Sequence, residues 1–296
     1  MPVIKLKNNE ISYDFSFEQK YLFIRGDSGI GKTSLIQLVS DYNTNPDAII
    51  CDGDTNIKVL NSENDLIEKN TVFFLDENMP LLYRSDCSTL LNNSDNYFII
   101  INRSRKFGGL KTGLDSLVIM RAESDGSHTI EPAYPKESRL NQLADTIICE
   151  DTNSGKLFLE QVFGIHIEAA GSKDRLAIAM RKLNKSQYTI VYDRAGISFS
   201  YEDQMDYLKQ KNIKVVSEID WDCFESYVLE SDDYGVKVDW FPDKEQNAVR
   251  LMKELFPNYN KSMLPQDMKL PIYWKIKDAQ ELLEKSQHKT VSIDAF

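Results

Sequence analysis

Apolar residues fall into short continuous runs, and the stretches between these runs carry apolar residues at helical spacing. The run NYFIIINR at residues 96–103 is typical of the first part of the chain. Continuous apolar runs of this length predict strands buried on both faces, as in a parallel sheet covered by helices. The predicted strands are 20–26, 47–53, 71–78, 96–103 and 116–122, with a predicted helix at 31–42.

The first residues follow a different pattern. In VIKLKNNEISYDFSF, residues 3–17, apolar and polar side chains alternate on either side of Asn8-Asn9. This pattern predicts an antiparallel hairpin that turns at the two asparagines.

A polar stretch with two prolines, EPAYPKESRLNQ at residues 131–142, separates this series from a second one. The second series has predicted strands at 145–151, 165–171, 188–196 and 213–219, and predicted helices at 153–163, 173–183 and 201–211. The end of the chain has helical patterns at 223–230, 243–256 and 277–287. We therefore predict an α/β fold with two domains, 1–137 and 138–232, each a mostly parallel sheet flanked by helices, and a helical C-terminal extension at 233–296.

The composition fits a globular protein with apolar cores, since 42% of the residues are hydrophobic and 27% are charged. No apolar run approaches the roughly 20 residues of a membrane span, and the first residues lack the apolar stretch of a secretory signal. The four cysteines are scattered without a CxxC spacing. We therefore expect a cytoplasmic protein without a membrane partner.

The formal net charge is −11, so the chain as a whole is not steered toward nucleic acid. This charge argues mildly against a protein that coats nucleic acid. It leaves open an enzyme that contacts a few nucleotides.

The segment GDSGIGKTS at residues 26–34 completes the pattern G-x-x-x-x-G-K-[ST] between a predicted strand and a predicted helix. Backbone amides of such a loop and the helix N-terminus attract phosphate groups. Lys32 would neutralise the β- and γ-phosphates, and Thr33 would offer its hydroxyl to Mg²⁺. The predicted ATP-binding residues here are Gly26, Asp27, Ser28, Gly29, Ile30, Gly31, Lys32, Thr33 and Ser34.

Two acids follow the apolar run FFL. Asp76 is placed to hold Mg²⁺, and Glu77 to polarise the water that attacks the γ-phosphate. Asn102 follows the next run and would contact that phosphate or the water. Arg103 and Arg105 either act on the nucleotide of a neighbouring subunit, which would require a homo-oligomer, or are solvated.

These residues resemble the P-loop ATPases of ABC or AAA type that carry a catalytic glutamate, and the resemblance covers about residues 1–135. It implies ATP hydrolysis with Lys32 and Glu77 as catalytic residues. The sequence has no LSGGQ-like motif, so a transporter ATPase is disfavoured. A small-molecule kinase is another interpretation, although no acceptor site is evident.

Acids also follow the strands of the second series: Glu150, Asp193, and a group that contains Asp222 and Glu225. Parallel strands end at one edge of a sheet, where open α/β sites form. Carboxylates without histidine or cysteine suit Mg²⁺ or Mn²⁺, and two such ions clamp a phosphodiester. The alternative is a plain α/β domain, because acids are common where strands meet solvent.

The order of these acids resembles the toprim fold of topoisomerases, primases and OLD-family nucleases, over about residues 143–232. Glu150 matches the glutamate after the first strand, and Asp193 matches the first aspartate of D-x-D. Ala195 stands where the second aspartate would be. The segment DCFESYVL resembles an acidic segment of bacterial-defence toprim proteins. The resemblance implies Glu150, Asp193, Asp222 and Glu225 as metal ligands, the first two of them catalytic.

Together the two halves resemble OLD-family and PARIS-type anti-phage defence proteins. This resemblance implies an ATPase that controls a metal-dependent nuclease acting on DNA or RNA, with a partner protein. Ala195 favours the other interpretation, a nucleotide-gated regulator or scaffold whose toprim-like domain is inactive.

Overall fold

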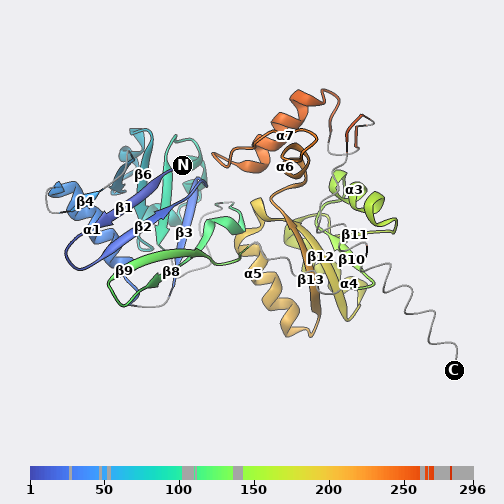
Figure 1. The fold of residues 1–296 in the computed structure, drawn as a ribbon. Coiled ribbons are helices and arrows are strands. Elements are labelled where there is room, and N and C mark those ends of the chain that lie inside the picture. Colours follow the sequence, from blue (N-terminus) through green and yellow to red (C-terminus); the bar gives the residue numbers. More distant parts are fainter. Residues whose placement is uncertain are drawn as a thin grey trace. The chain divides into compact units, whose positions relative to one another are not determined.

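The computed structural model forms two compact units, one of residues Met1–Pro135 with Trp240–Asp243, the other of Lys136–Asp239 with Lys244–Phe296. Each unit is α/β, with a mostly parallel sheet flanked by helices (Figure 1). The structure describes residues 1–26, 29–46, 49–51, 55–101, 110, 112–135, 143–260, 264–265, 267–269 and 281. Over these residues no helix combines the length and the apolar character needed to cross a membrane.

The sheet of the first unit has the strand order β4-β1-β2-β9-β8-β3-β7-β6-β5. Its strands are β1 (Val3–Lys7), β2 (Ser12–Ser16), β3 (Tyr21–Arg25), β4 (Ile50–Cys51), β5 (Asn56–Val59), β6 (Thr71–Leu75), β7 (Tyr97–Ile101), β8 (Leu117–Ala122) and β9 (Ser127–Pro132). The five strands β8-β3-β7-β6-β5 are mutually parallel. The predicted buried strands at 71–78 and 96–103 are confirmed as β6 and β7.

The predicted hairpin is also confirmed, because β1 and β2 pair antiparallel. Its turn is fixed by Asn8, whose side-chain oxygen accepts hydrogen bonds from the backbone N–H groups of Glu10 and Ile11, both at 2.9 Å. An asparagine side chain that bonds the backbone two and three residues later mimics a backbone turn. The turn residue therefore specifies where this hairpin reverses.

The first unit also has the helices α1 (Lys32–Thr44) and α2 (Cys87–Asn92) and the short 3₁₀ helices η2 (Glu63–Ile67), η3 (Pro80–Tyr83) and η4 (Leu114–Ser116). Helix α1 buries Leu35, Leu38 and Val39 in one cluster with Val72 and Phe74 of β6. This packing fixes the start of α1 beside the carboxyl ends of the parallel strands.

The second unit has a parallel sheet of order β11-β10-β12-β13. Its elements are β10 (Ile147–Cys149), α3 (Ser154–Phe163), β11 (Glu168–Ala169), η5 (Lys173–Arg175), α4 (Leu176–Leu183), β12 (Gln187–Asp193), α5 (Arg194–Gln210), β13 (Lys214–Trp221), α6 (Phe224–Leu229) and α7 (Lys244–Leu255). The alternation of strands and helices predicted from the sequence is confirmed here, and α7 belongs to this unit.

Helices cover both faces of this sheet. Phe158 of α3, Val228 of α6 and Met252 of α7 share a buried cluster with Val191 and Ile219 of the strands. Helices α4 and α5 pack against each other and against the strands from the other side. Because both faces are buried, the strands read as continuous apolar runs.

One predicted boundary differs from the structure in a way that matters for the site. The predicted strand 188–196 ends at Asp193, and α5 begins at Arg194. Ala195 lies in the first turn of this helix and donates its backbone N–H to the Asp222 carbonyl at 2.8 Å. Position 195, the second position of the D-x-D pattern, therefore lies in the helix and not on the strand, because β12 ends at Asp193 and α5 begins at the next residue.

Candidate functional site

The loop after β3 is shaped by three glycines with positive φ, Gly26 at 143°, Gly29 at 89° and Gly31 at 90°. Side chains are strained in this region of backbone conformation. At Gly31 a Cβ would also lie 2.5 Å from His128 Nε2 and 3.0 Å from Tyr13 Oη. The glycine spacing in GDSGIGK is thus required by the path of the loop. Asp27 and Ser28 lie outside the described residues.

Lys32 begins α1 directly after this loop and is 5% exposed. Its Nζ donates to the carbonyl of Gly26 at 2.6 Å, so the ammonium lies over the loop. Thr33 and Ser34 are exposed in the first turn of the helix. A loop at a helix N-terminus, with a lysine above it and hydroxyls beside it, matches the chemistry of a phosphate site.

Tyr13 and His128 hold the far end of the loop, and sequence reasoning missed both. The Tyr13 hydroxyl donates to the Gly31 carbonyl at 2.7 Å, and Leu35 N–H donates to the same oxygen at 2.9 Å. His128 stacks on Tyr13 with ring centroids 4.6 Å apart. Burial raises the pKa of Tyr13 to about 12, which keeps the hydroxyl a donor. Because a peptide is planar, the Lys32 N–H must point away from these donors.

Asp76 and Glu77 follow β6 at the same edge of the sheet where the loop after β3 begins. Strand β7 lies between β6 and β3, so the two strand ends are roughly 10 Å apart, or two strand spacings. Asp76 is exposed, and its Oδ1 accepts the backbone N–H of Glu77 at 2.6 Å. The structure therefore brings these acids to the edge that holds the loop. Asn102, Arg103 and Arg105 lie outside the described residues.

The acids of the second unit gather where its chain changes direction across the sheet. In the order β11-β10-β12-β13, strand β10 connects to β11 on one side and β12 connects to β13 on the other, so the connections from β10 and β12 leave in opposite directions. Ligand sites of open α/β sheets form at the carboxyl ends of such strands. Glu150 follows β10 and Asp193 ends β12, and Asp193 N–H donates to Glu150 Oε2 at 3.2 Å. The structure thus brings these two predicted residues together.

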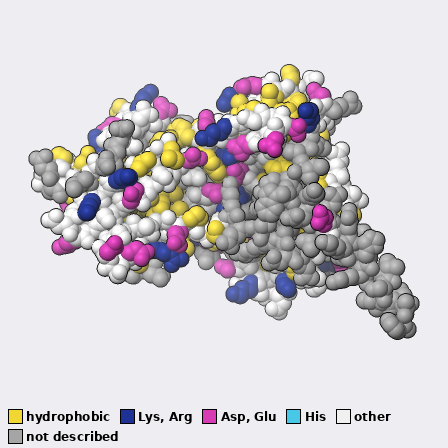
Figure 2. All heavy atoms as spheres, viewed as in Figure 1, with side chains coloured by type: hydrophobic (Ala, Val, Ile, Leu, Met, Phe, Trp, Pro, Cys, Tyr) yellow, Lys and Arg dark blue, Asp and Glu magenta, His cyan; other side chains and the backbone are white. Residues whose placement is uncertain are grey.

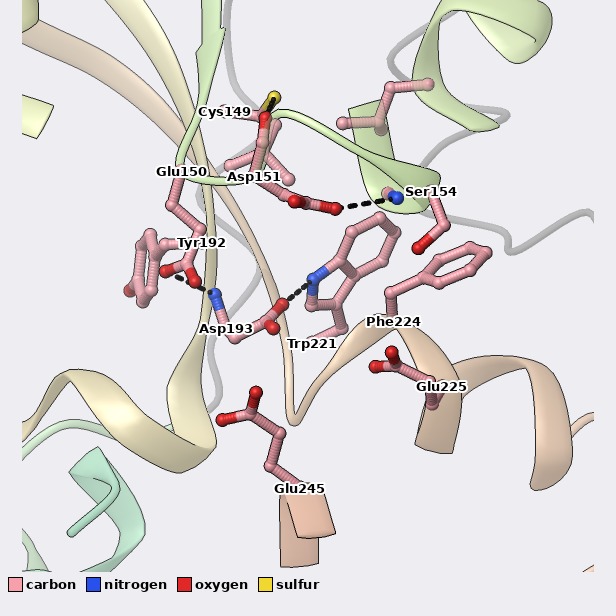
Figure 3. Close-up of a pocket in the computed structure, with 13 residues that line it drawn as sticks. Cys149, Glu150, Asp151, Ser154, Tyr192, Asp193, Trp221, Phe224, Glu225 and Glu245 are labelled. Atoms are coloured by element: carbon pink, nitrogen blue, oxygen red, sulfur yellow. Dashed lines mark hydrogen bonds between the residues drawn. The ribbon is translucent and has the colours of Figure 1, made fainter. Parts of the chain in front are cut away.

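A pocket opens at this point (Figure 3). The carboxylates that line it belong to Glu150, Asp151, Asp193, Glu225 and Glu245. Trp221 and Phe224 supply aromatic walls, and the Trp221 indole N–H donates to Asp193 Oδ1. The pocket therefore combines oxygen donors with a partly apolar lining.

The pocket shifts the protonation of its two central acids. Burial raises the pKa of Glu150 from 4.5 to about 7; Glu245 and Asp151 add to this shift, whereas the Asp193 N–H and Lys173 oppose it. Burial also raises the pKa of Asp193 well above 3.8, with repulsion from Glu150, Glu225 and Glu245. Such shifts mark carboxylates that hold protons more tightly than in water. A bound cation would take the place of those protons.

Glu225 lines the pocket as predicted and is 2% exposed. Its Oε1 accepts a hydrogen bond from the Tyr259 hydroxyl at 2.9 Å. Sequence reasoning missed Glu245 on α7, whose carboxylate points toward Asp193 (Figure 3). It also missed Asp151, which accepts backbone N–H bonds from Asn153 at 3.0 Å and Gly155 at 2.9 Å and so holds the start of α3.

Asp222 lies elsewhere. Its Oδ2 accepts a hydrogen bond from Lys244 Nζ at 2.7 Å, and the Lys244 ammonium also lies 3.1 Å from Glu230 Oε1. The side chains of Lys244 and Asp222 are 5% and 10% exposed, so this is a largely buried ion pair. Asp222 does not line the pocket. The structure therefore does not bring Asp222 to Glu150 and Asp193 as the sequence predicted.

The oxygen donors fit a hard divalent cation, since Glu150 and Asp193 are neighbours and Glu225 and Glu245 face the same pocket. Within the described residues, however, no three His, Cys, Asp or Glu side chains are gathered closely enough to form a ready-made metal-binding group. A cation would thus have to draw these carboxylates together.

Surface charge is mixed. On the face shown in Figure 2, the coloured Lys and Arg side chains are interspersed with Asp and Glu. A mixed surface gives no broad steering of a polyanion. The described part of this face therefore offers no broad positive patch to a nucleic acid.

No protein-family model, curated protein or solved structure matches this chain. The function must therefore be inferred from the loop after β3 and the pocket beside β10 and β12, by their own geometry and chemistry.

Proposed function

We propose that this chain binds ATP and Mg²⁺ at residues 26–34 and that its acidic pocket cleaves DNA or RNA with Mg²⁺ or Mn²⁺. One observation carries the nuclease proposal: Glu150 and Asp193 meet at the carboxyl ends of adjacent parallel strands, in a pocket shared with Glu225 and Glu245. Such a group of oxygen donors suits the cations that catalyse phosphodiester cleavage.

In this proposal Glu150 and Asp193 hold the cation, which activates water and neutralises charge on the phosphate when it is bound. The Trp221 indole bonds one oxygen of Asp193 and so orients its carboxylate. Asp151 holds the N-terminus of α3 beside the pocket. These contacts support a site whose central ligand is oriented by neighbouring groups, which is what a fixed coordination geometry requires.

For the nucleotide, the loop amides and Lys32 bind the phosphates. Thr33 and Asp76 hold Mg²⁺, and Glu77 orients water. The glycine conformations and the position of Lys32 over the loop support this half of the proposal. We further propose that ATP binding or hydrolysis controls the nuclease. An anti-phage role with a partner protein follows from the resemblance to OLD-family and PARIS-type proteins.

The test uses purified full-length protein with Mg²⁺ or Mn²⁺, with and without ATP, on single-stranded DNA, duplex DNA and RNA. We expect divalent-dependent cleavage that Glu150→Gln abolishes and a dependence on ATP that Lys32→Ala abolishes. The proposal is wrong if no substrate is cut under any of these conditions, alone or with the natural partner.

A second function is favoured by two specific observations. Ala195, at the position of the second aspartate of D-x-D, lies in helix α5, and Asp222 is paired with Lys244. The second aspartate of D-x-D and one of the four predicted ligands, Asp222, are thus absent from the pocket, as in a nucleotide-gated regulator or scaffold with an inactive toprim-like domain. Cation-dependent binding of nucleic acid without cleavage, in the wild-type chain, would favour this alternative.

A further inference from the structure

Lys173 places a positive charge next to the acidic pocket. It begins η5, which follows the edge strand β11, so it comes from the strand next to the one that Glu150 follows. Its positive charge stabilises the ionised carboxylate of Glu150 and so lowers the pKa of that group. A Cβ placed at Gly196 would collide with the Lys173 Nζ and lie 3.6 Å from Glu245 Oε2. The ammonium therefore lies against the first turn of α5, near two of the pocket's carboxylates.

The backbone of Lys173 is anchored by a buried amide. Gln204 of α5 is 8% exposed and donates its Nε2 to the Lys173 carbonyl at 2.6 Å. The same side chain accepts the Ala177 N–H through Oε1 at 3.0 Å. One amide thus fixes both η5 and the start of α4 to α5. This anchor places the base of the lysine side chain relative to Gly196.

Lys156, another partly buried lysine of this unit, has its ion-pair partner on its own helix. Its Nζ pairs with Glu160 at 2.6 Å, one turn along its own helix α3. Pairs of this kind contribute a few tenths of a kcal/mol to helix stability. Lys173 instead faces a different strand and a different helix from its own.

The charge of the pocket suggests a role for the Lys173 ammonium in binding an anionic substrate. A phosphodiester is an anion, and a pocket lined by five acidic side chains repels it. One divalent cation offsets only part of that negative charge. A second positive group beside the cation would reduce the repulsion and could bond the phosphate directly.

We propose that the Lys173 ammonium binds a non-bridging phosphate oxygen of the nucleic-acid substrate beside the cation site of Glu150 and Asp193. The cation and Lys173 then share the neutralisation of a pocket that lacks an acid at position 195. This inference rests on the proposed nuclease function for its substrate class, and it assigns to Lys173 a contact with the substrate.

The test compares full-length wild type with Lys173→Met, Lys173→Arg and Gly196→Ala, and uses Lys182→Met as control because Lys182 is an exposed lysine on α4. Binding of a short fluorescent DNA or RNA oligonucleotide is measured in Ca²⁺ at several salt concentrations. Mn²⁺ affinity is measured separately by electron paramagnetic resonance. Cleavage in Mn²⁺ is followed in parallel, with Glu150→Gln as the inactive reference.

We expect Lys173→Met to weaken oligonucleotide binding about 10-fold and to reduce the salt slope by about one unit. Mn²⁺ affinity should stay the same or increase, because a competing positive charge is gone. Lys173→Arg should retain most of the affinity, and Lys182→Met should match wild type. Gly196→Ala keeps the charge but displaces the ammonium, so its affinity should fall a few-fold without loss of folding.

Wild-type binding by Lys173→Met would overturn the inference, even if the wild type cleaves and the nuclease proposal stands. A parallel loss of Mn²⁺ affinity would also overturn it, since Lys173 would then act by building the cation site. If the wild type binds through Lys173 but never cleaves, the inference stands and the nuclease proposal falls. If the wild type binds no oligonucleotide, both are wrong.

Discussion

The loop after β3 in the first unit and the acidic pocket of the second lie at the same kind of place, the carboxyl ends of parallel strands. Their energetics differ. In the loop, Lys32 bonds the Gly26 carbonyl and the Gly31 carbonyl accepts two donors. In the pocket, burial and mutual repulsion raise the pKa of both Glu150 and Asp193.

The difference shows how each edge is prepared for its ligand. The Lys32 ammonium already has a partner in the chain, so an incoming phosphate would exchange its hydrogen bond to the Gly26 carbonyl for one to a phosphate oxygen. Carboxylates of the pocket repel one another when ionised, so protons or a cation must relieve that repulsion. We therefore expect the loop to keep its conformation without a ligand, and we expect the ionised carboxylates of the pocket to destabilise the second unit until a cation binds.

The largest expected effect concerns Asp222, which pairs with Lys244 and does not line the acidic pocket, so we expect it to stabilise the fold. Lys244→Met leaves the Asp222 carboxylate buried without its ammonium, and breaking a buried pair from one side costs about 3 kcal/mol or more. Urea unfolding of the second unit measures this loss. Lys253→Met, an exposed lysine on the same helix, should have little effect.

A different result would reassign Asp222. If Lys244→Met leaves the free energy of unfolding unchanged and tightens Mn²⁺ binding, then Asp222 belongs to the cation site. Replacing both partners, Asp222→Leu with Lys244→Met, should recover much of the lost stability, because an apolar pair avoids the uncompensated charge.

The second effect tests whether the two edges are separate sites. Lys32→Met removes the ammonium that lies over the loop and should weaken ATP binding about 100-fold, which is roughly 2.7 kcal/mol. Mn²⁺ affinity of the acidic pocket, measured without nucleotide, should be unchanged. Lys69→Met, whose side chain is 74% exposed, is the matched control. A change in Mn²⁺ affinity would break the comparison.

Much of the acidic edge could be predicted from the sequence. Glu150 and Asp193 each end an apolar run, and the β/α alternation predicts that such ends meet at one edge. Nothing local predicts Glu245, because it reaches the pocket only through the docking of α7 by Ala248 and Met252 in the shared core. The pairing of Asp222 with Lys244 depends on the same docking.

The strands that sequence reasoning missed have weak patterns. Strand β5 has only four residues, NIKV, and β9 reads SHTIEP, which is largely polar. Their positions come from pairing with β6 and β8. Tyr13 and His128 face the loop because β2 and β9 pair in register at these two residues. Long-range pairing of this kind is not encoded in any short stretch of sequence.

The third effect is a gain in stability from a site residue. The pKa of Glu150 is higher in the folded protein than its ordinary 4.5, so the folded state holds the proton more tightly. The contribution of Glu150 to the free energy of unfolding therefore falls as the pH rises from about 4.5 to about 7, and this cost remains above that pH. Glu150→Gln removes much of this cost and should stabilise the second unit by about 2 kcal/mol at pH 8, because the glutamine is neutral but still a buried polar group.

Thermal unfolding in EDTA at pH 4 and pH 8 measures this gain. The difference between Glu150→Gln and wild type should appear at pH 8 and vanish at pH 4, where the carboxyl is protonated in both states. Saturating Mn²⁺ should raise the melting temperature of wild type only. Glu254→Gln, an exposed acid on α7, serves as control. If Glu150→Gln is less stable than wild type at pH 8, then the ionised Glu150 carboxylate does not destabilise the second unit.

The smallest effect tests how the loop keeps its shape. Tyr13→Phe removes one of two donors to the Gly31 carbonyl and keeps the ring that stacks on His128. The carbonyl keeps its hydrogen bond from the Leu35 N–H, so the peptide stays in place but is held less firmly. ATP affinity should therefore fall about 5-fold, or about 1 kcal/mol.

The matched control is Tyr21→Phe, which removes a hydroxyl bond of 2.6 Å to Asn92 at the other end of β3. Both variants should lose similar stability, but only Tyr13→Phe should lose ATP affinity, because only the Tyr13 hydroxyl bonds the peptide between Gly31 and Lys32, whose N–H would bind phosphate in the proposed site. Equal ATP affinity in the two variants would mean that the glycines alone shape the loop.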